Sequence, residues 1–136
     1  MESNTSKVDP YAVASELGLE VKHQPLPLGY HGLYTGSCII LLPGMTQREE
    51  RSTLAHELGH HHYGHTHVHR SFEPKLEAAC DLYAAEMLID EVALLKLAHL
   101  YPDDPATIAY ELNVSSWVLE AWAKEHPLPA DMDVAA

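Results

Sequence analysis

The stretch that decides the fold is Thr53-Leu54-Ala55-His56-Glu57-Leu58-Gly59-His60-His61-His62. It contains the pattern His-Glu-x-x-His. Residues four apart lie on one face of an α-helix, one turn apart, so His56 and His60 are expected to reach one metal ion together. Glu57 projects beside them, where a carboxylate can take a proton from a water on that ion. The chain holds 11 histidines, so the pattern needs support from residues elsewhere.

The flanking residues predict a helix with defined ends. Thr46 and Glu49 form a capping box, with threonine at the N-cap and glutamate three residues on. Gly64 is expected to end the helix at about residue 62 or 63. Leu54 and Leu58 share one face, which is expected to pack against a sheet.

A second long helix is predicted to begin at Glu73-Pro74, because proline suits the first helical turn. Its apolar residues recur every three or four positions and indicate a buried stripe rather than a cofactor site. The stripe consists of Leu76, Ala79, Cys80, Tyr83, Ala84, Met87 and Leu88.

The same helix carries the best candidate for a third metal ligand. A catalytic zinc ion takes three protein ligands and leaves a fourth position for water. Glu77 can supply the third ligand if this helix folds back on the first. Asp81, one turn further, can accept the spare N–H of a ligand imidazole and fix its tautomer. A solvated acidic helix face is the alternative interpretation of Glu77 and Asp81, and Glu73 is a weaker rival that is expected to cap its helix.

Further histidines crowd the segment after the first helix, at positions 61, 62, 65, 67 and 69. Most are expected to be solvated loop residues. His65 lies nearest the metal helix without being on it, which makes it a candidate donor to a substrate oxyanion.

The N-terminal part predicts one helix and three strands. Asp9-Pro10 begins a short helix that Gly18 stops. Residues 19–22 alternate as a strand, and residues 31–34 and 38–42 form a hairpin around Gly36. The second hairpin strand is the most apolar run of this half, so it is expected to be central and buried.

The C-terminal part predicts further helices. Residues 94–99 continue or restart the second long helix, and residues 106–112 and 115–125 have the rhythm of a helix-turn-helix. This pair has Lys124 as its one basic residue against three glutamates, which argues against DNA binding and favours C-terminal packing or partner docking. We expect a single domain over residues 9–126, with a disordered N-terminus at 1–8 and a flexible tail at 127–136.

The composition narrows the classes of function. Eight basic and 20 acidic residues give a net charge of −12 with histidine neutral. This balance argues against non-specific binding to nucleic acid or anionic membranes and suits a basic partner. No apolar run is long enough to span a membrane, and the N-terminus lacks the regions of a signal peptide. A cytoplasmic location with reduced Cys38 and Cys80 is therefore expected.

At residues 47–60, 64–66 and 77–85 the chain resembles the ImmA/IrrE family of metallo-endopeptidases. These segments read QREERSTLAHELGH, GHT and EAACDLYAA. The resemblance covers roughly residues 9–125, with Cys80 standing where the family usually has alanine. It implies a gluzincin-like fold, with His56, His60 and Glu77 as ligands and Glu57 as the base. Joined to the predicted elements, it gives an α+β fold in which a small three-stranded antiparallel sheet packs on a mainly helical zincin-like core.

The resemblance also implies a function: cytoplasmic, zinc-dependent cleavage of a transcriptional repressor, often one encoded beside the protease in a phage or mobile element. Mn²⁺ suits the same two imidazoles and carboxylate. The substrate is expected to lie extended beside the edge of the sheet. The alternative is a metal-dependent regulator that sequesters the repressor without cutting it.

Overall fold

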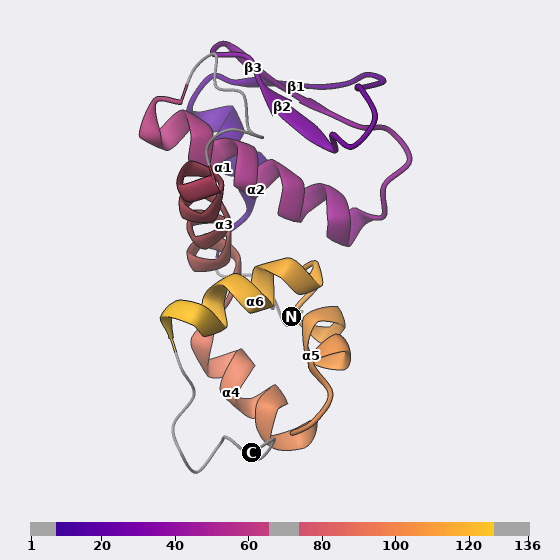
Figure 1. The fold of residues 1–136 in the computed structure, drawn as a ribbon, viewed down its shortest axis with the longest axis vertical. Helices are drawn as coiled ribbons and strands as arrows, with labels where there is room; N and C mark the ends of the chain where they lie inside the picture. Colours follow the sequence, from indigo (N-terminus) through magenta and orange to yellow (C-terminus); the bar gives the residue numbers. More distant parts are fainter. Residues whose placement is uncertain (1–7, 66–73, 127–136) are drawn as a thin grey trace.

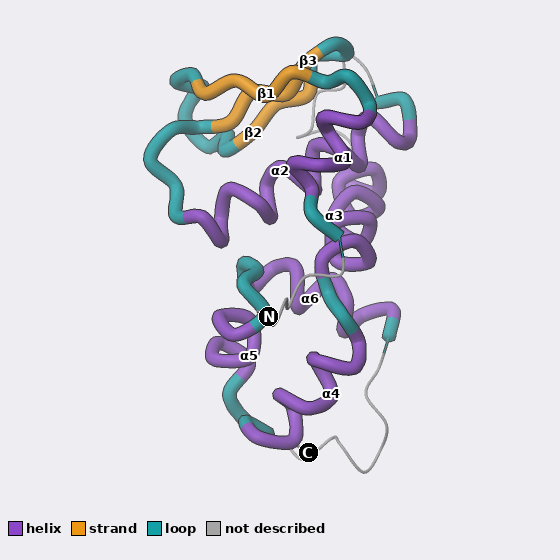
Figure 2. Tube along the Cα trace, turned by 180° about the vertical axis from the view of Figure 1, so that it is seen from behind, coloured by secondary structure: helices purple, strands orange, loops and turns teal. Residues whose placement is uncertain are grey.

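The computed structural model describes residues 8–65 and 74–126. The expectations for 1–7, for the tail at 127–136, and for His67, His69 and Glu73 lie outside these residues. All three strands lie at one end of the molecule, and α4, α5 and α6 lie toward the other end (Figures 1 and 2). In chain order they are α1 (Pro10–Glu16), β1 (Glu20–His23), β2 (Gly32–Tyr34), β3 (Cys38–Leu41), α2 (Gln47–Tyr63), α3 (Pro74–Leu88), α4 (Glu91–Leu100), α5 (Pro105–Glu111) and α6 (Ser116–Glu125).

The sheet is mixed, so the expected all-antiparallel arrangement is wrong. Its strand order is β1-β3-β2, with β1 parallel and β2 antiparallel to β3. Ile39 and Leu41 of β3 are fully buried, as expected for a central strand. This burial explains the topology. Because the most apolar strand lies in the middle, β1 pairs with β3 instead of with its chain neighbour β2, and the two strands then run in the same direction.

Helix α2 has the predicted ends. The Thr46 side chain accepts from the Glu49 N–H at 3.1 Å, and the Glu49 carboxylate accepts from the Thr46 N–H at 3.1 Å. Gly64 takes a left-handed conformation with φ of 74°, which suits glycine at a helix end. Leu54 and Leu58 are fully buried in the core that includes Ile39 of the sheet. Figure 1 shows α2 lying across the sheet.

Close packing between α2 and α3 depends on Gly59. A Cβ at this position would lie 3.0 Å from both Cα and Cβ of Cys80. Any larger residue would therefore push the two helices apart. The close approach allows Glu77, one turn before Cys80 on α3, to reach the histidine face of α2.

The C-terminal helices continue from α3 at the far end of the molecule (Figure 1). The sequence left open whether residues 94–99 continue or restart the second long helix. The structure shows a restart, because α3 ends at Leu88 and Asp90 caps α4 through the Val92 N–H. The turn between α5 and α6 is held against α2 by polar contacts. Arg51 donates to the carbonyl of Asn113, and Ser52 Oγ accepts from the Ser115 N–H at 2.9 Å. These contacts fix the start of α6 beside α2.

A helix that crosses a membrane must be both long and apolar, and the helices of the described residues are all too short or too polar for this.

Candidate metal centre

Three side chains from α2 and α3 converge in the structure. His56 Nε2 lies 2.9 Å from one carboxylate oxygen of Glu77, and His60 Nε2 lies 3.1 Å from the other. Their donor atoms all lie within 4.8 Å of one another. His56 and His60 are buried, at 9% and 3% exposure, while Glu77 is partly buried. The helical spacing therefore brings together the three residues that the sequence singled out as ligands.

Asp81 lies on the opposite side of the His56 ring from Glu77. His56 Nδ1 donates to Asp81 Oδ1 at 2.7 Å. A carboxylate in this position holds the proton on Nδ1 and so directs the lone pair of a neutral imidazole to Nε2. The arrangement aims His56 Nε2 at the point where Glu77 and His60 converge.

These contacts shift the pKa values of two groups. Burial lowers the pKa of His56, but hydrogen bonds to Asp81 and Glu77 outweigh it and raise the pKa to about 9. Burial raises the pKa of Glu77, yet its contacts with His56 and His60 prevail and lower it to about 2. In the protein without metal, the Glu77 carboxylate therefore faces a protonated His56 at neutral pH.

Two buried polar atoms of the site indicate that it fits a cation. His60 Nε2 and Glu77 Oε2 both lack a hydrogen bond, although the 3.1 Å between them meets an ion-pair distance. Both atoms point into the space between the two helices, where His56 Nε2 also lies. A divalent cation between them, also bound by His56 Nε2, would satisfy both atoms. Two imidazoles and one carboxylate are a ligand set that zinc takes in catalytic sites.

Glu57 is buried next to this cluster, at 1% exposure. It borders a cavity of about 260 Å³ that opens beside His56. A Cβ on Gly32 of β2 would lie 3.1 Å from Glu57 Oε2 and 2.6 Å from Thr53 Cγ2, so only glycine leaves room for both side chains. The cavity is lined by Gly29, His31, Gly32, Thr53, His56, Glu57, Asp81 and Trp117.

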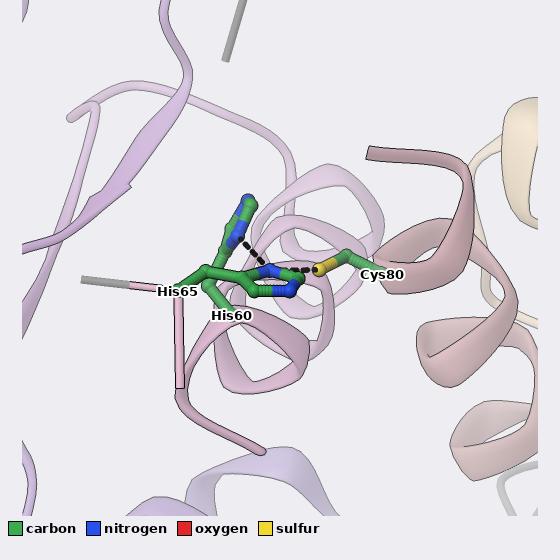
Figure 3. A group of neighbouring side chains, drawn as sticks. All are labelled: His60, His65 and Cys80. Atoms are coloured by element: carbon green, nitrogen blue, oxygen red, sulfur yellow. Dashed lines mark hydrogen bonds between the residues drawn. The ribbon is translucent and has the colours of Figure 1, made fainter. Parts of the chain in front are cut away.

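His65 lies between His60 and Cys80, as Figure 3 shows. Its Nδ1 is 3.1 Å from His60 Nδ1 and 3.7 Å from Cys80 Sγ. Glu77 faces the other nitrogen of His60. The oxyanion role suggested by the sequence stays a prediction, since His65 is not among the residues that line the cavity beside Glu57.

Trp117 is the main residue that sequence reasoning missed. Its ring meets the His56 ring edge-on, with centroids 5.9 Å apart and planes at 90°. It comes from the first turn of α6, which the Ser52 and Arg51 contacts hold against α2. The sequence carries no local signal for this contact, because it depends on how α6 packs. Sequence reasoning also missed His31 and Gly32 as residues of the cavity beside Glu57, because neither belongs to a recognisable motif.

Comparison with known proteins agrees with this geometry. The model of the IrrE N-terminal-like domain, peptidase family M78, matches residues 14–122. This match covers both helices of the metal centre, the sheet, and α6 as far as Trp122. Searches of curated proteins and of solved structures gave no significant match. The chain belongs to the IrrE N-terminal-like (ImmA/IrrE) family of peptidases.

Proposed function

We propose that this protein is a zinc-dependent endopeptidase that hydrolyses a peptide bond in a protein substrate. Family membership supports a metallopeptidase-type function. The single observation that carries the finer proposal is the convergence of His56, His60 and Glu77 beside the buried carboxylate of Glu57. The proposed domain, residues 9–126, contains all of these groups, and a cytoplasmic location belongs to the same proposal.

In this proposal His56 and His60 hold the metal through Nε2 and Glu77 holds it through its carboxylate. Asp81 orients His56 through the 2.7 Å contact with Nδ1. When bound, zinc or manganese supplies a Lewis acid that lowers the pKa of water and polarises the scissile carbonyl.

Glu57 is the proposed general base. It accepts the proton of the attacking water and later passes that proton to the leaving amine. Its position suits this role, because the buried Glu57 side chain borders the cavity that opens beside His56.

Strand β2 gives the substrate a place to bind. It is an edge strand of the sheet, and its first residue, Gly32, lines the Glu57 cavity. An extended peptide added beside β2, an outer strand of the sheet, would run past Glu57. A second cavity of about 290 Å³ adjoins the first through His31, Thr53 and Trp117, which extends the groove toward the start of α2. We infer that the substrate is a helix-turn-helix repressor of a phage or mobile element, because the resemblance to the ImmA/IrrE family implies such a target.

The experiment that tests the proposal is incubation of the purified protein with the repressor encoded nearest to it. New fragments that appear with zinc and vanish with a chelator support proteolysis. A stable complex without fragments favours the alternative, a metal-dependent regulator that sequesters the repressor.

A further inference from the structure

A second cluster of metal-binding groups lies behind the proposed catalytic site. It consists of His60, His65 and Cys80, whose donor atoms all lie within 4.8 Å of one another (Figure 3). His60 and Cys80 are buried, at 3% and 0% exposure, and His65 is partly exposed. Neither Cys80 nor Cys38 forms a disulfide, so Cys80 carries a thiol.

The distances in this cluster suit a tetrahedral ion. Bonds of about 2.0 Å to nitrogen and about 2.3 Å to sulfur place two nitrogens roughly 3.3 Å apart and a nitrogen and a sulfur roughly 3.5 Å apart. The structure has 3.1 Å between His60 Nδ1 and His65 Nδ1, and 3.7 Å between His65 Nδ1 and Cys80 Sγ. Small rotations of the three side chains would bring them onto one cation.

We propose that His60, His65 and Cys80 form a second site, which takes a thiophilic divalent cation such as Zn²⁺, Co²⁺ or Cd²⁺. Two imidazole nitrogens and one sulfur are ligands that such cations prefer over the hard ions Mg²⁺ and Mn²⁺. On binding, the Cys80 thiol gives its proton to solvent and coordinates as the thiolate. The site goes beyond the proposed peptidase function and does not depend on it.

The two sites share His60. Its Nε2 faces Glu77 at 3.1 Å, while its Nδ1 faces His65 at 3.1 Å. A neutral imidazole offers a lone pair on only one of its two nitrogens. A cation bound at Nδ1 therefore weakens cation binding at Nε2, and the reverse holds to the same extent. Excess thiophilic metal would in this way lower the metal occupancy of the proposed catalytic site.

Cobalt spectroscopy on the full-length protein tests the second site separately from catalysis. Apo protein is titrated with Co²⁺, and the thiolate-to-cobalt charge-transfer absorption in the near ultraviolet is recorded. The band is expected in wild type and in Glu77→Gln, which disables the first site alone. It is expected to disappear in Cys80→Ser and to weaken strongly in His65→Ala.

Cys38→Ser is the matched control, because Cys38 lies on β3 with its sulfur 3.4 Å from Thr35 Oγ1 and does not belong to the cluster. It is expected to keep the full band. If the band were absent from both wild type and Glu77→Gln, the proposal would be overturned. His60, His65 and Cys80 would then be joined by hydrogen bonds alone. A band that survives in Cys80→Ser and vanishes in Cys38→Ser would overturn it as well. Circular dichroism confirms that each variant is folded.

A zinc titration against a competing chromophoric chelator gives the second readout. Glu77→Gln, in which the first site cannot compete for His60, is expected to bind one zinc ion, and Glu77→Gln with Cys80→Ser is expected to bind none. Identical titrations for the two proteins would contradict the site. Failure here would leave the peptidase proposal intact, since that proposal concerns Nε2 of His60 and not Nδ1.

Discussion

His56 is held between two carboxylates: Nδ1 lies 2.7 Å from Asp81 Oδ1, and Nε2 lies 2.9 Å from Glu77 Oε1. The two acids lie four residues apart on α3, on the same face of that helix. They therefore contact the two nitrogens on opposite edges of the His56 ring, which comes from α2. In the proposed metal centre they have different tasks. Glu77 binds the cation, and Asp81 fixes the tautomer that lets His56 bind it.

Substitution of Asp81 tests the second task. Asp81→Ala is expected to lower zinc affinity by about 10–100-fold, because the His56 ring loses the acceptor that orients it. Asp81→Asn is expected to lose less, since an amide oxygen still accepts from Nδ1. Competition with a chelator of known affinity measures both variants. Equal affinities for Asp81→Ala and wild type would show that His56 is oriented by other groups.

Removal of the Glu77 charge tests the third ligand. Glu77→Gln keeps the size of the side chain but loses the anionic oxygens that face both histidines. In a Cys80→Ser background, which removes the second proposed site, the protein is therefore expected to lose zinc on dialysis. Glu86→Gln is the matched control on the same helix, because Glu86 contacts His126 far from the centre. Metal content by elemental analysis decides the outcome. A full complement of zinc in Glu77→Gln in that background would move the third ligand to another residue.

The stability of the metal-free protein is expected to depend on pH through this centre. The pKa of His56 is raised to about 9, so its contacts with the carboxylates stabilise the fold fully below about pH 6.5 and are lost as the pH rises through 9. The pKa of Glu77 is lowered to about 2, so its contribution is present above about pH 4.5 and is lost as the pH falls through 2. Thermal unfolding in chelator from pH 4 to pH 10 is expected to show Tm falling above pH 6.5. His56→Ala should lack that fall, and an equal slope in both proteins would contradict the assignment.

Gly32 tests how Glu57 is placed. Gly32→Ala is expected to reduce cleavage while zinc binding persists, because the new Cβ would press on Glu57 and Thr53 but not on His60 or Glu77. Overpacking of this kind costs about 1–3 kcal/mol of stability. Adding Thr53→Ser removes the methyl group that lies 2.6 Å from the new Cβ, so the double variant should regain part of the activity. Full activity in Gly32→Ala alone would show that Glu57 has room to move.

The sequence predicted α2 well because its signals are local. The capping box at Thr46, the stop at Gly64 and the four-residue spacing of His56 and His60 each act within a turn or two of helix. Glu77 and Asp81 were also predictable, since helical spacing places both on one face of α3. That His56, Glu57, His60, Glu77 and Asp81 come together in one site was inferred from the chemistry of a zinc site, because the sequence itself shows no contact between the two helices.

Other features depend on tertiary packing and had no such signal. The direction of β1 was predicted wrongly, because strand alternation at residues 19–22 shows which face is buried and not which strand is the neighbour. Trp117 reaches His56 only because Arg51 and Ser52 hold the α5–α6 turn against α2. Gly59 marks the closest contact of α2 and α3, and a glycine inside a helix does not reveal its partner.

The central claim is that Glu57 acts as the base of a metal-dependent peptidase. The most direct measurement compares cleavage of the repressor by wild type and Glu57→Gln, with zinc content determined on the same samples. The account predicts full zinc in both proteins and a cleavage rate lower by roughly 10²–10⁴-fold in Glu57→Gln, because the amide cannot accept the proton. A fully loaded Glu57→Gln variant that cleaves at the wild-type rate would contradict it.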